Sequence, residues 1–496
     1  MTELHRAARF APAFGGGSWR GGPISESRVS RWESGFTPVP YAAVRRYEEL
    51  LLLPRNAIVA PLDVLYRYIS PPEPLRLSLA RGPALAAGPD RLDQLLDLAV
   101  TGARMRGADW DELTSRLLAE PGVRLVPSSS WSTLTDRLVA EMVMSDGVAW
   151  QQRYEALNRL LVHPRACAPA IDSCASLARD RDNQIFIEPM SALEGTGHPD
   201  AARHVLAQLR DPTHQRARIG ALLASLRKVP MGHFSDEQHA ALVQMAIEML
   251  SDRETSSLAA QLAVELRIER ETWLRLNAPV RRGASDSRGD NAVQRRTVSN
   301  RIAHAAAVET AGEHIPKADD IFSVLVEDAL FHPSPDVRLY TGFLLDATPY
   351  RAGLANALAA ELTGDRIRSN PGLAEAILDS IRVLGGAGQE QLVQRLIVAS
   401  GVPSTVRIAA AFALGHFGAE VPKSLVLQVA RQMDGPPTDA SPQTGVMEGT
   451  VYAAGLKGDD ELLRHLISDR RVPTALRRSA NWWLNRPGHV RQSASR

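Results

Sequence analysis

Val402-Pro403-Ser404-Thr405-Val406-Arg407-Ile408-Ala409-Ala410-Ala411-Phe412-Ala413-Leu414-Gly415 is the stretch that decides the fold. Its apolar side chains recur at the three-to-four-residue spacing of one helix face, and a proline stands where the helix would begin. The same pattern starts at Pro335 and again at Arg471. In each copy an arginine follows an aliphatic residue of the apolar face, at positions 338, 407 and 477, which are 69 and 70 residues apart.

Weaker copies of this pattern lie at Gly372–Leu384 and Gly445–Leu456, so the underlying period is about half of 70 residues. A period of ~30–47 residues with two helices per unit is typical of a solenoid. The segments resemble HEAT repeats, whose second helix often carries Val-Arg followed by small residues and Leu-Gly. The resemblance covers about 330–486 and extends more loosely back to about 160, and it implies helix pairs that bury their apolar faces against neighbouring pairs. The alternative is an irregular helical bundle.

Composition excludes several other classes of protein. The chain has 496 residues, of which 44% are hydrophobic and 23% charged, and its formal net charge is +1. No apolar run approaches the ~18 residues of a membrane span, and no secretory signal precedes residue 30. Cys167 and Cys174 are too few for a disulfide framework. The sequence therefore predicts a cytoplasmic, all-α protein, and its bias toward arginine and alanine is typical of high-GC bacteria.

Segments rich in proline, glycine or charged residues divide the chain into five regions. We expect a helix-turn-helix head at 1–69, a proline-rich linker at 70–88, a helical middle region at 89–162, HEAT-like repeats at 163–486, and a frayed tail at 487–496. A polar, arginine-rich segment at 281–290 is predicted to be a mobile loop within the repeats. It is either a passive connector or an arm that adds phosphate contacts or docks an acidic partner.

The head is predicted from Ile24-Ser25-Glu26-Ser27-Arg28-Val29-Ser30-Arg31-Trp32-Glu33-Ser34-Gly35. Ser25 is a favourable N-cap and Gly35 a favourable stop, so we expect a helix just under three turns long. Val29 and Trp32 would face inward. The side chains left outside are of types that contact base edges and phosphates, namely Glu26, Ser27, Arg28, Ser30 and Arg31.

This stretch closely resembles the recognition helix of the Cro/repressor-type helix-turn-helix family, often called XRE. The resemblance implies that Glu26 and Ser27, which follow the capping serine, meet bases in the major groove of double-stranded DNA. Arg31 would lie one turn further along the same side, and Arg28 and Ser30 would contact phosphates or flanking bases.

The helix that follows in the family corresponds to Pro40–Leu52, in which we expect Arg45 and Arg46 to be exposed. Residues 1–60 hold eight arginines and five glutamates, a modest basic excess. The chain departs from the family before the recognition helix, where 11–23 is rich in glycine and proline. Each glycine costs ~1 kcal/mol and each proline ~3 kcal/mol inside a helix, so no regular scaffold helix is expected there.

Other chemistry finds little support in the sequence. His163, Cys167 and Cys174 lack a fourth metal ligand at a standard spacing, and buried structural cysteines explain them better. Neither a P-loop nor a nucleophile elbow occurs, and the tryptophans do not assemble a glycosylase site with an Asp and an Arg. We therefore expect no metal, no cofactor and no enzymatic activity.

The predicted function is that of a sequence-specific DNA-binding transcriptional regulator whose repeats sense a partner or mediate assembly. A homodimer is expected, because regulators of this type pair two heads on one site. The alternative is a HEAT-type scaffold that binds a protein on its concave face and carries a vestigial head.

Overall fold

The computed structural model describes residues 13–14, 22–69, 89–252, 255–268, 288–311, 320–418, 420–432 and 441–494. Within these ranges every regular element is a helix, and no strand occurs. The prediction of an all-α helical-repeat fold is confirmed. In the same ranges, no helix combines the length and apolar character needed to cross a membrane.

Five helices in the C-terminal half stack in a row, each packed on the next: α18 (Pro335–Asp346), α21 (Pro371–Leu384), α23 (Ser404–Ala413), α25 (Pro442–Lys457) and α27 (Thr474–Leu484). They are the helices predicted from the repeated pattern. A second set precedes them or lies between them in sequence: α17 (Asp320–Phe331), α19 (Arg351–Glu361), α20 (Gly364–Ser369), α22 (Ala387–Val398), α24 (Lys423–Arg431) and α26 (Asp460–Ser468). The long helix α16 (Arg288–Ala311) packs on α17 and α19.

The repeated arginine joins consecutive helices. Nη1 of Arg338 donates to the carbonyl oxygen of His332 at 2.7 Å, and Nε of Arg407 donates to that of Ile397 at 2.8 Å. Both acceptors lie at the end of the preceding helix, where carbonyl groups have no partner within the helix. The third copy differs, because Arg477 donates to the hydroxyl of Thr474.

Small residues bring neighbouring repeats close together. A Cβ added to Gly449 on α25 would lie 2.7 Å from that of Ala411 on α23. One added to Gly455 would lie 2.1 Å from the ring of Trp483 on α27. Glycine is therefore required at both positions by packing, since any side chain would push the helices apart.

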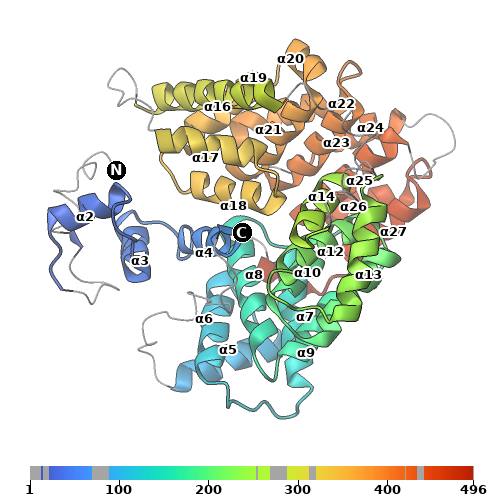
Figure 1. Ribbon diagram of the computed structural model, residues 1–496. Coiled ribbons are helices and arrows are strands. Elements are labelled where there is room, and N and C mark those ends of the chain that lie inside the picture. Colours follow the sequence, from blue (N-terminus) through green and yellow to red (C-terminus); the bar gives the residue numbers. More distant parts are fainter. Residues whose placement is uncertain are drawn as a thin grey trace.

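The N-terminal half forms a second group of helices, drawn in blue-green to green in Figure 1 below α16–α19. They are α5 (Pro89–Thr101), α6 (Gly107–Ala119), α7 (Ser130–Val143), α8 (Gly147–Val162), α9 (Cys167–Arg179), α10 (Ile187–Ser191), α11 (Pro199–Arg210), α12 (Gln215–Lys228), α13 (Asp236–Met249) and α14 (Ser256–Glu265). Their apolar residues and those of the repeats belong to one core that runs from Leu92 to Ala494. The middle region and the repeats are therefore a single packed body.

The repeat array curls back, and its last helices pack on its first. Nε1 of Trp483 donates to Oε1 of Gln184 at 2.7 Å, and Nε1 of Trp482 donates to Oδ2 of Asp180 at 2.8 Å. The expectation that each pair of helices buries its face only against its neighbours in sequence is wrong, because the two ends of the array also bury surface against each other.

The tail is helical as far as it is described, to residue 494, which corrects the prediction that 487–496 frays. Residues Gly488–Ala494 form α28, which packs on α7, and Val490 is only 2% exposed. Met105 donates its backbone N–H to the Ser493 hydroxyl, and Nη2 of Arg153 donates to the Ser493 carbonyl oxygen at 2.7 Å. The sequence of this segment has little apolar content, so it does not predict that the segment packs on α6–α8.

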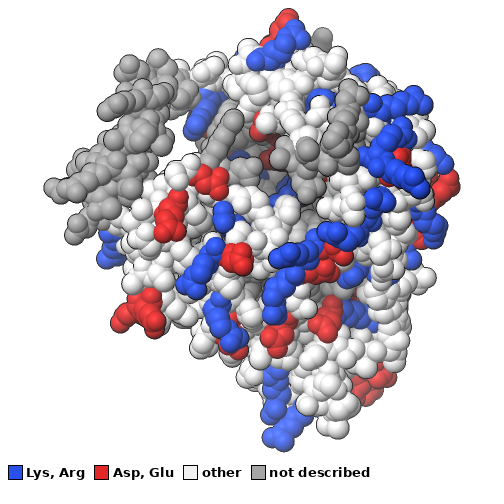
Figure 2. Space-filling view, turned by 90° about the vertical axis from the view of Figure 1, so that its right-hand side faces the viewer, with Lys and Arg blue, Asp and Glu red and all other residues white. Residues whose placement is uncertain are grey.

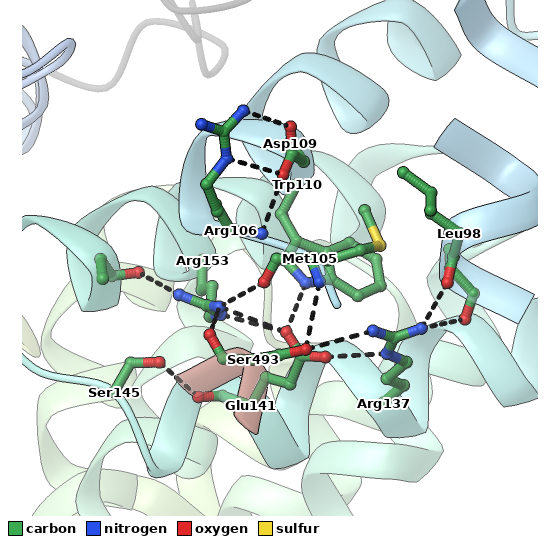
Figure 3. Close-up of polar contacts among 12 residues, drawn as sticks. Leu98, Met105, Arg106, Asp109, Trp110, Arg137, Glu141, Ser145, Arg153 and Ser493 are labelled. Atoms are coloured by element: carbon green, nitrogen blue, oxygen red, sulfur yellow. Dashed lines mark hydrogen bonds and ion pairs between the residues drawn. The ribbon is translucent and has the colours of Figure 1, made fainter. Parts of the chain in front are cut away.

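Figure 3 shows the buried charge cluster that holds α28. Glu141 of α7 is fully buried between Arg137, at 2.8 Å, and Arg153, at 3.3 Å. It also accepts a hydrogen bond from Nε1 of Trp110 at 2.7 Å. Arg137 donates further to the backbone carbonyls of Leu98, Ala99 and Ala103. The carboxylate is thereby satisfied by three donors, and this cluster joins α5–α8 and α28.

Two predicted segments fall largely outside the described residues. The whole linker at 70–88 lies outside them, and so does 281–287 of the predicted loop. For residues 288–290 the prediction of a loop is wrong, because Arg288 already begins α16. Arg295 and Arg296 belong to the same helix, where Arg296 pairs with Glu327 at 3.0 Å.

Candidate nucleic-acid interface

The head contains α2 (Glu26–Glu33) and α3 (Tyr41–Leu50), and α4 (Val59–Ile69) connects it to the repeats. The predicted limits of the first helix are confirmed. Ser25 occupies the N-cap position, and Gly35 follows the helix with φ of +72°. Such a left-handed backbone favours glycine and explains why the helix ends there.

A small aromatic core fixes the orientation of α2. Val29 is fully buried and Trp32 is 5% exposed, as predicted. The ring of Phe14 packs against Trp32 with centroids 5.7 Å apart and edge-on against Tyr47 at 5.3 Å. Tyr47 lies on α3, so this core holds the two helices together and turns the opposite face of α2 to solvent.

That opposite face carries the side chains predicted to contact DNA. Glu26, Ser27, Arg28, Ser30 and Arg31 are all exposed. Nε of Arg31 donates to the Ser27 carbonyl oxygen at 3.2 Å, which directs the guanidinium along the helix. The guanidinium of Arg28 lies over the Trp32 ring, 5.3 Å from its centroid. The structure thus brings five of the seven predicted side chains onto one short polar surface.

The serine at the N-cap does not form the expected capping hydrogen bond. The hydroxyl of Ser25 instead lies 3.0 Å from the hydroxyl of Ser27. Like every helix start, α2 has N–H groups in its first turn that lack an intrahelical acceptor. These groups face the same surroundings as Glu26 and Ser27, and helix N-termini favour anions such as phosphate.

Arg45 and Arg46 are not exposed, which corrects the prediction for α3. Arg45 is 7% exposed and pairs with Glu48 at 3.4 Å. Arg46 donates to the carbonyl oxygens of Ala13 and Phe14 at 2.8 and 3.1 Å, and it pairs with Glu49 at 2.8 Å. Both guanidinium groups are used to hold the head together, so we remove them from the candidate interface.

The same helix connects the head to α4. Glu48 is 2% exposed and accepts backbone N–H groups of Ile58 and Val59 at 2.8 and 2.9 Å. A carboxylate at the start of α4 satisfies its first N–H groups and complements the helix dipole. The sequence analysis did not identify Glu48 as a residue that caps α4. The only indication in the sequence is an acidic side chain ahead of the start of a helix.

Helix α4 docks in the middle of the body, between the two groups of helices (Figure 1). Val64 packs with Tyr340 and Phe343 of α18. Near the end of α4, Tyr68 donates a hydrogen bond to Asp336, and the Arg227 guanidinium lies 4.4 Å from the centroid of its ring. The head is therefore attached through a helix that touches α8, α12 and α18 at once.

The surface of the array carries both signs of charge. On the face shown in Figure 2, Asp and Glu side chains lie among the Lys and Arg side chains, several of which gather toward the upper right. Within the array, Arg478 pairs with Asp182 at 2.8 Å and Arg216 with Glu448 at 3.6 Å. Paired guanidinium groups such as these add little to a long-range field.

The cysteine and histidine residues weighed as metal ligands do not assemble. Cys174 is fully buried, and burial raises the pKa of its thiol to about 12. His163 uses Nδ1 as an acceptor for the backbone N–H of Ala166, and its ring stacks near Trp131. Among the described residues no group of three metal-binding side chains occurs.

No family model, no curated protein and no solved structure matches this chain.

Proposed function

We propose that this protein is a sequence-specific DNA-binding transcriptional regulator that reads DNA with α2. The observation that carries the proposal is the exposed face of α2, which presents Glu26, Ser27, Ser30 and Arg31 together while Val29 and Trp32 are buried behind it. A short helix backed by a small core, with hydrogen-bonding side chains on its free side, has the form of an element that enters a major groove.

The roles of the side chains follow from their positions on the helix. Glu26 and Ser27 lie in the first turn, where side chains of a recognition helix approach base edges. A glutamate accepts a hydrogen bond from the cytosine amino group, and an arginine donates two to a guanine. Arg31, one turn later, is assigned to a base. Arg28 is stacked on Trp32 and is assigned, with Ser30, to phosphates.

The packing of the repeat array supports a role in regulation rather than as a scaffold. Helix α4 packs on α18, and the two ends of the array pack on each other, so less of its surface is open to a protein partner than in an extended scaffold. This favours a regulator over the alternative of a HEAT-type scaffold with a vestigial head. We further propose a bacterial, cytoplasmic homodimer whose body supplies the dimer contact.

The test is a titration of the whole protein with labelled DNA from its own promoter region, followed by fluorescence anisotropy. The proposal expects saturable binding that competitor DNA of random sequence displaces poorly, and that weakens steeply as salt rises because phosphate contacts release counterions. Absence of binding at low salt would instead favour the scaffold.

A further inference from the structure

A pocket of about 430 Å³ opens between α16, α17, α18 and α21, in the upper group of helices in Figure 1. Its apolar wall comes from Val298, Leu330, Phe331 and Leu373. Pockets that hold small molecules have volumes of about 300–1,000 Å³ and combine apolar walls with a few polar groups. This pocket has that size, and its lining combines an apolar wall with a larger share of polar groups.

Two guanidinium groups face the pocket, and none of the described residues that line it is a carboxylate. Arg295 of α16 is exposed, with its guanidinium 5.8 Å from the centroid of the Phe331 ring. Arg338 of α18 is held by the His332 carbonyl oxygen at 2.7 Å. Neither arginine forms an ion pair with any residue that the structure describes. The pocket therefore presents two guanidinium groups that no described carboxylate contacts, beside an apolar wall.

The surroundings of Arg338 strengthen this conclusion. Burial lowers the pKa of its guanidinium, although the carboxylates of Asp379 and Asp336 act in the opposite direction. Those carboxylates attract the charge from a distance without contacting it. A guanidinium that is partly removed from water without a contacting anion gains when an anion reaches it.

The start of α21 closes the third side of the pocket. Asn370 caps this 14-residue helix by accepting the backbone N–H of Leu373 at 3.1 Å, and Gly372 lines the pocket. A Cβ added to Gly372 would meet nothing nearer than Oδ1 of Asn370, at 3.9 Å. The positive end of the helix dipole thus adds to the two guanidinium groups on an open wall.

We propose that this pocket binds a small organic anion with an apolar body, the anionic group lying between Arg295 and Arg338 and the body lying on Phe331 and Leu373. The charge on both arginines selects an anion, and the apolar wall selects against inorganic ions, whose hydration it cannot replace.

The pocket is placed to act on the head. Arg338 lies on α18, and the same helix holds α4 through Asp336, Tyr340 and Phe343. A ligand that changes the position of α18 therefore changes the docking of the helix that leads to α2. This regulatory role rests on the proposed function, whereas binding of the anion does not.

The binding test uses the whole protein without DNA and the probe 1-anilinonaphthalene-8-sulfonate, an aromatic anion that fluoresces in apolar sites. We expect saturable binding of one probe per chain, displaced by octanoate. Arg295→Gln should weaken binding by about tenfold, the effect of one charge-assisted hydrogen bond. Ala376→Phe, which fills the pocket, should abolish it. The matched control is Arg296→Gln, because Arg296 lies outside the pocket and pairs with Glu327.

Equal affinity for the probe in the wild type, Arg295→Gln and Ala376→Phe would overturn the site, and so would the absence of saturable binding. Displacement by inorganic phosphate as efficient as that by octanoate would overturn the requirement for an apolar body. Hydrogen exchange then tests the connection to the head: octanoate should slow exchange of the amides in α18 and α4. Binding without a change in α4 would overturn the regulatory role, whatever the outcome with DNA.

Discussion

Tyr68 donates a hydrogen bond to the carboxylate of Asp336, 268 residues further along the chain. Burial raises the pKa of the Tyr68 phenol, and the nearby Asp336 raises it further, so the phenol keeps its proton and remains a donor. Burial also raises the pKa of Asp336, and the hydrogen bond from Tyr68 acts against that rise. This contact is a direct link between the helix that carries the head and the repeat array.

Tyr68→Phe should loosen the docking of α4. The substitution leaves the buried carboxylate of Asp336 without this donor, which costs ~1–3 kcal/mol. We expect faster hydrogen exchange in α4 and earlier proteolytic release of the head. Tyr66→Phe is the control, because Tyr66 is 63% exposed. Equal exchange in both variants would show that the hydrogen bond does not hold α4.

Glu141→Gln should destabilise the body strongly. It removes the charge that Arg137 and Arg153 share in a fully buried site, and breaking such a pair costs ~3–5 kcal/mol. Urea unfolding measures the change. Glu461→Gln, the same substitution at a side chain that is 85% exposed and pairs with Lys423, should stay within about 0.5 kcal/mol of the wild type. A similar loss in both variants would contradict the role of the Glu141 cluster.

Stability should depend on pH through Lys228. Its side chain is fully buried and donates to the carbonyl oxygens of Leu193 and Thr196, and burial lowers its pKa from 10.5 to about 8. Between pH 8 and 10.5 the unfolded chain binds more protons at this residue, so its contribution to the free energy of unfolding rises with pH, by up to about 3 kcal/mol.

The measurement compares urea unfolding of the wild type and Lys228→Met at pH 7.5 and 10, which cancels the titration of other groups. The wild type should gain stability relative to the variant at the higher pH. A difference that does not change between the two conditions would show that Lys228 titrates normally.

The sequence predicted those features that depend on local pattern. Ser25 and Gly35 mark the ends of α2, and the spacing of Val29 and Trp32 identifies its buried face. Helices α18, α23 and α27 begin where the repeated pattern begins. In these places each side chain's environment is set mainly by residues within one or two turns.

Features that depend on distant partners were not predictable in this way. Arg46 looks exposed in sequence and is held by the backbone of Ala13 and Phe14. The tail lacks a strong apolar pattern, yet Ser493 accepts hydrogen bonds from the backbone N–H of Met105 and from Arg153 of the Glu141 cluster. Nor does any periodicity place Arg295 beside Arg338, since the two arginines meet only after α16 packs on the repeats.

A homodimer is expected in solution. The eight residues of α2 span about 12 Å and reach one half-site, whereas paired half-sites lie about 34 Å apart. Light scattering of the whole chain should give twice the mass of 54.0 kDa. A chain lacking residues 1–74 should remain dimeric, because the body supplies the contact. Monomers in both cases would contradict the dimer, and loss of the dimer on truncation would place the contact in the head.

The central claim, that α2 reads DNA, is tested most directly by the affinity of Arg31→Ala for the promoter site and for DNA of random sequence, compared with Arg28→Ala. We predict that Arg31→Ala costs ~1–3 kcal/mol on the promoter site with little change on random DNA, so that specificity falls. Arg28→Ala should weaken both equally and lower the slope of log affinity against log salt by about one. Wild-type affinity and specificity in both variants would contradict the claim.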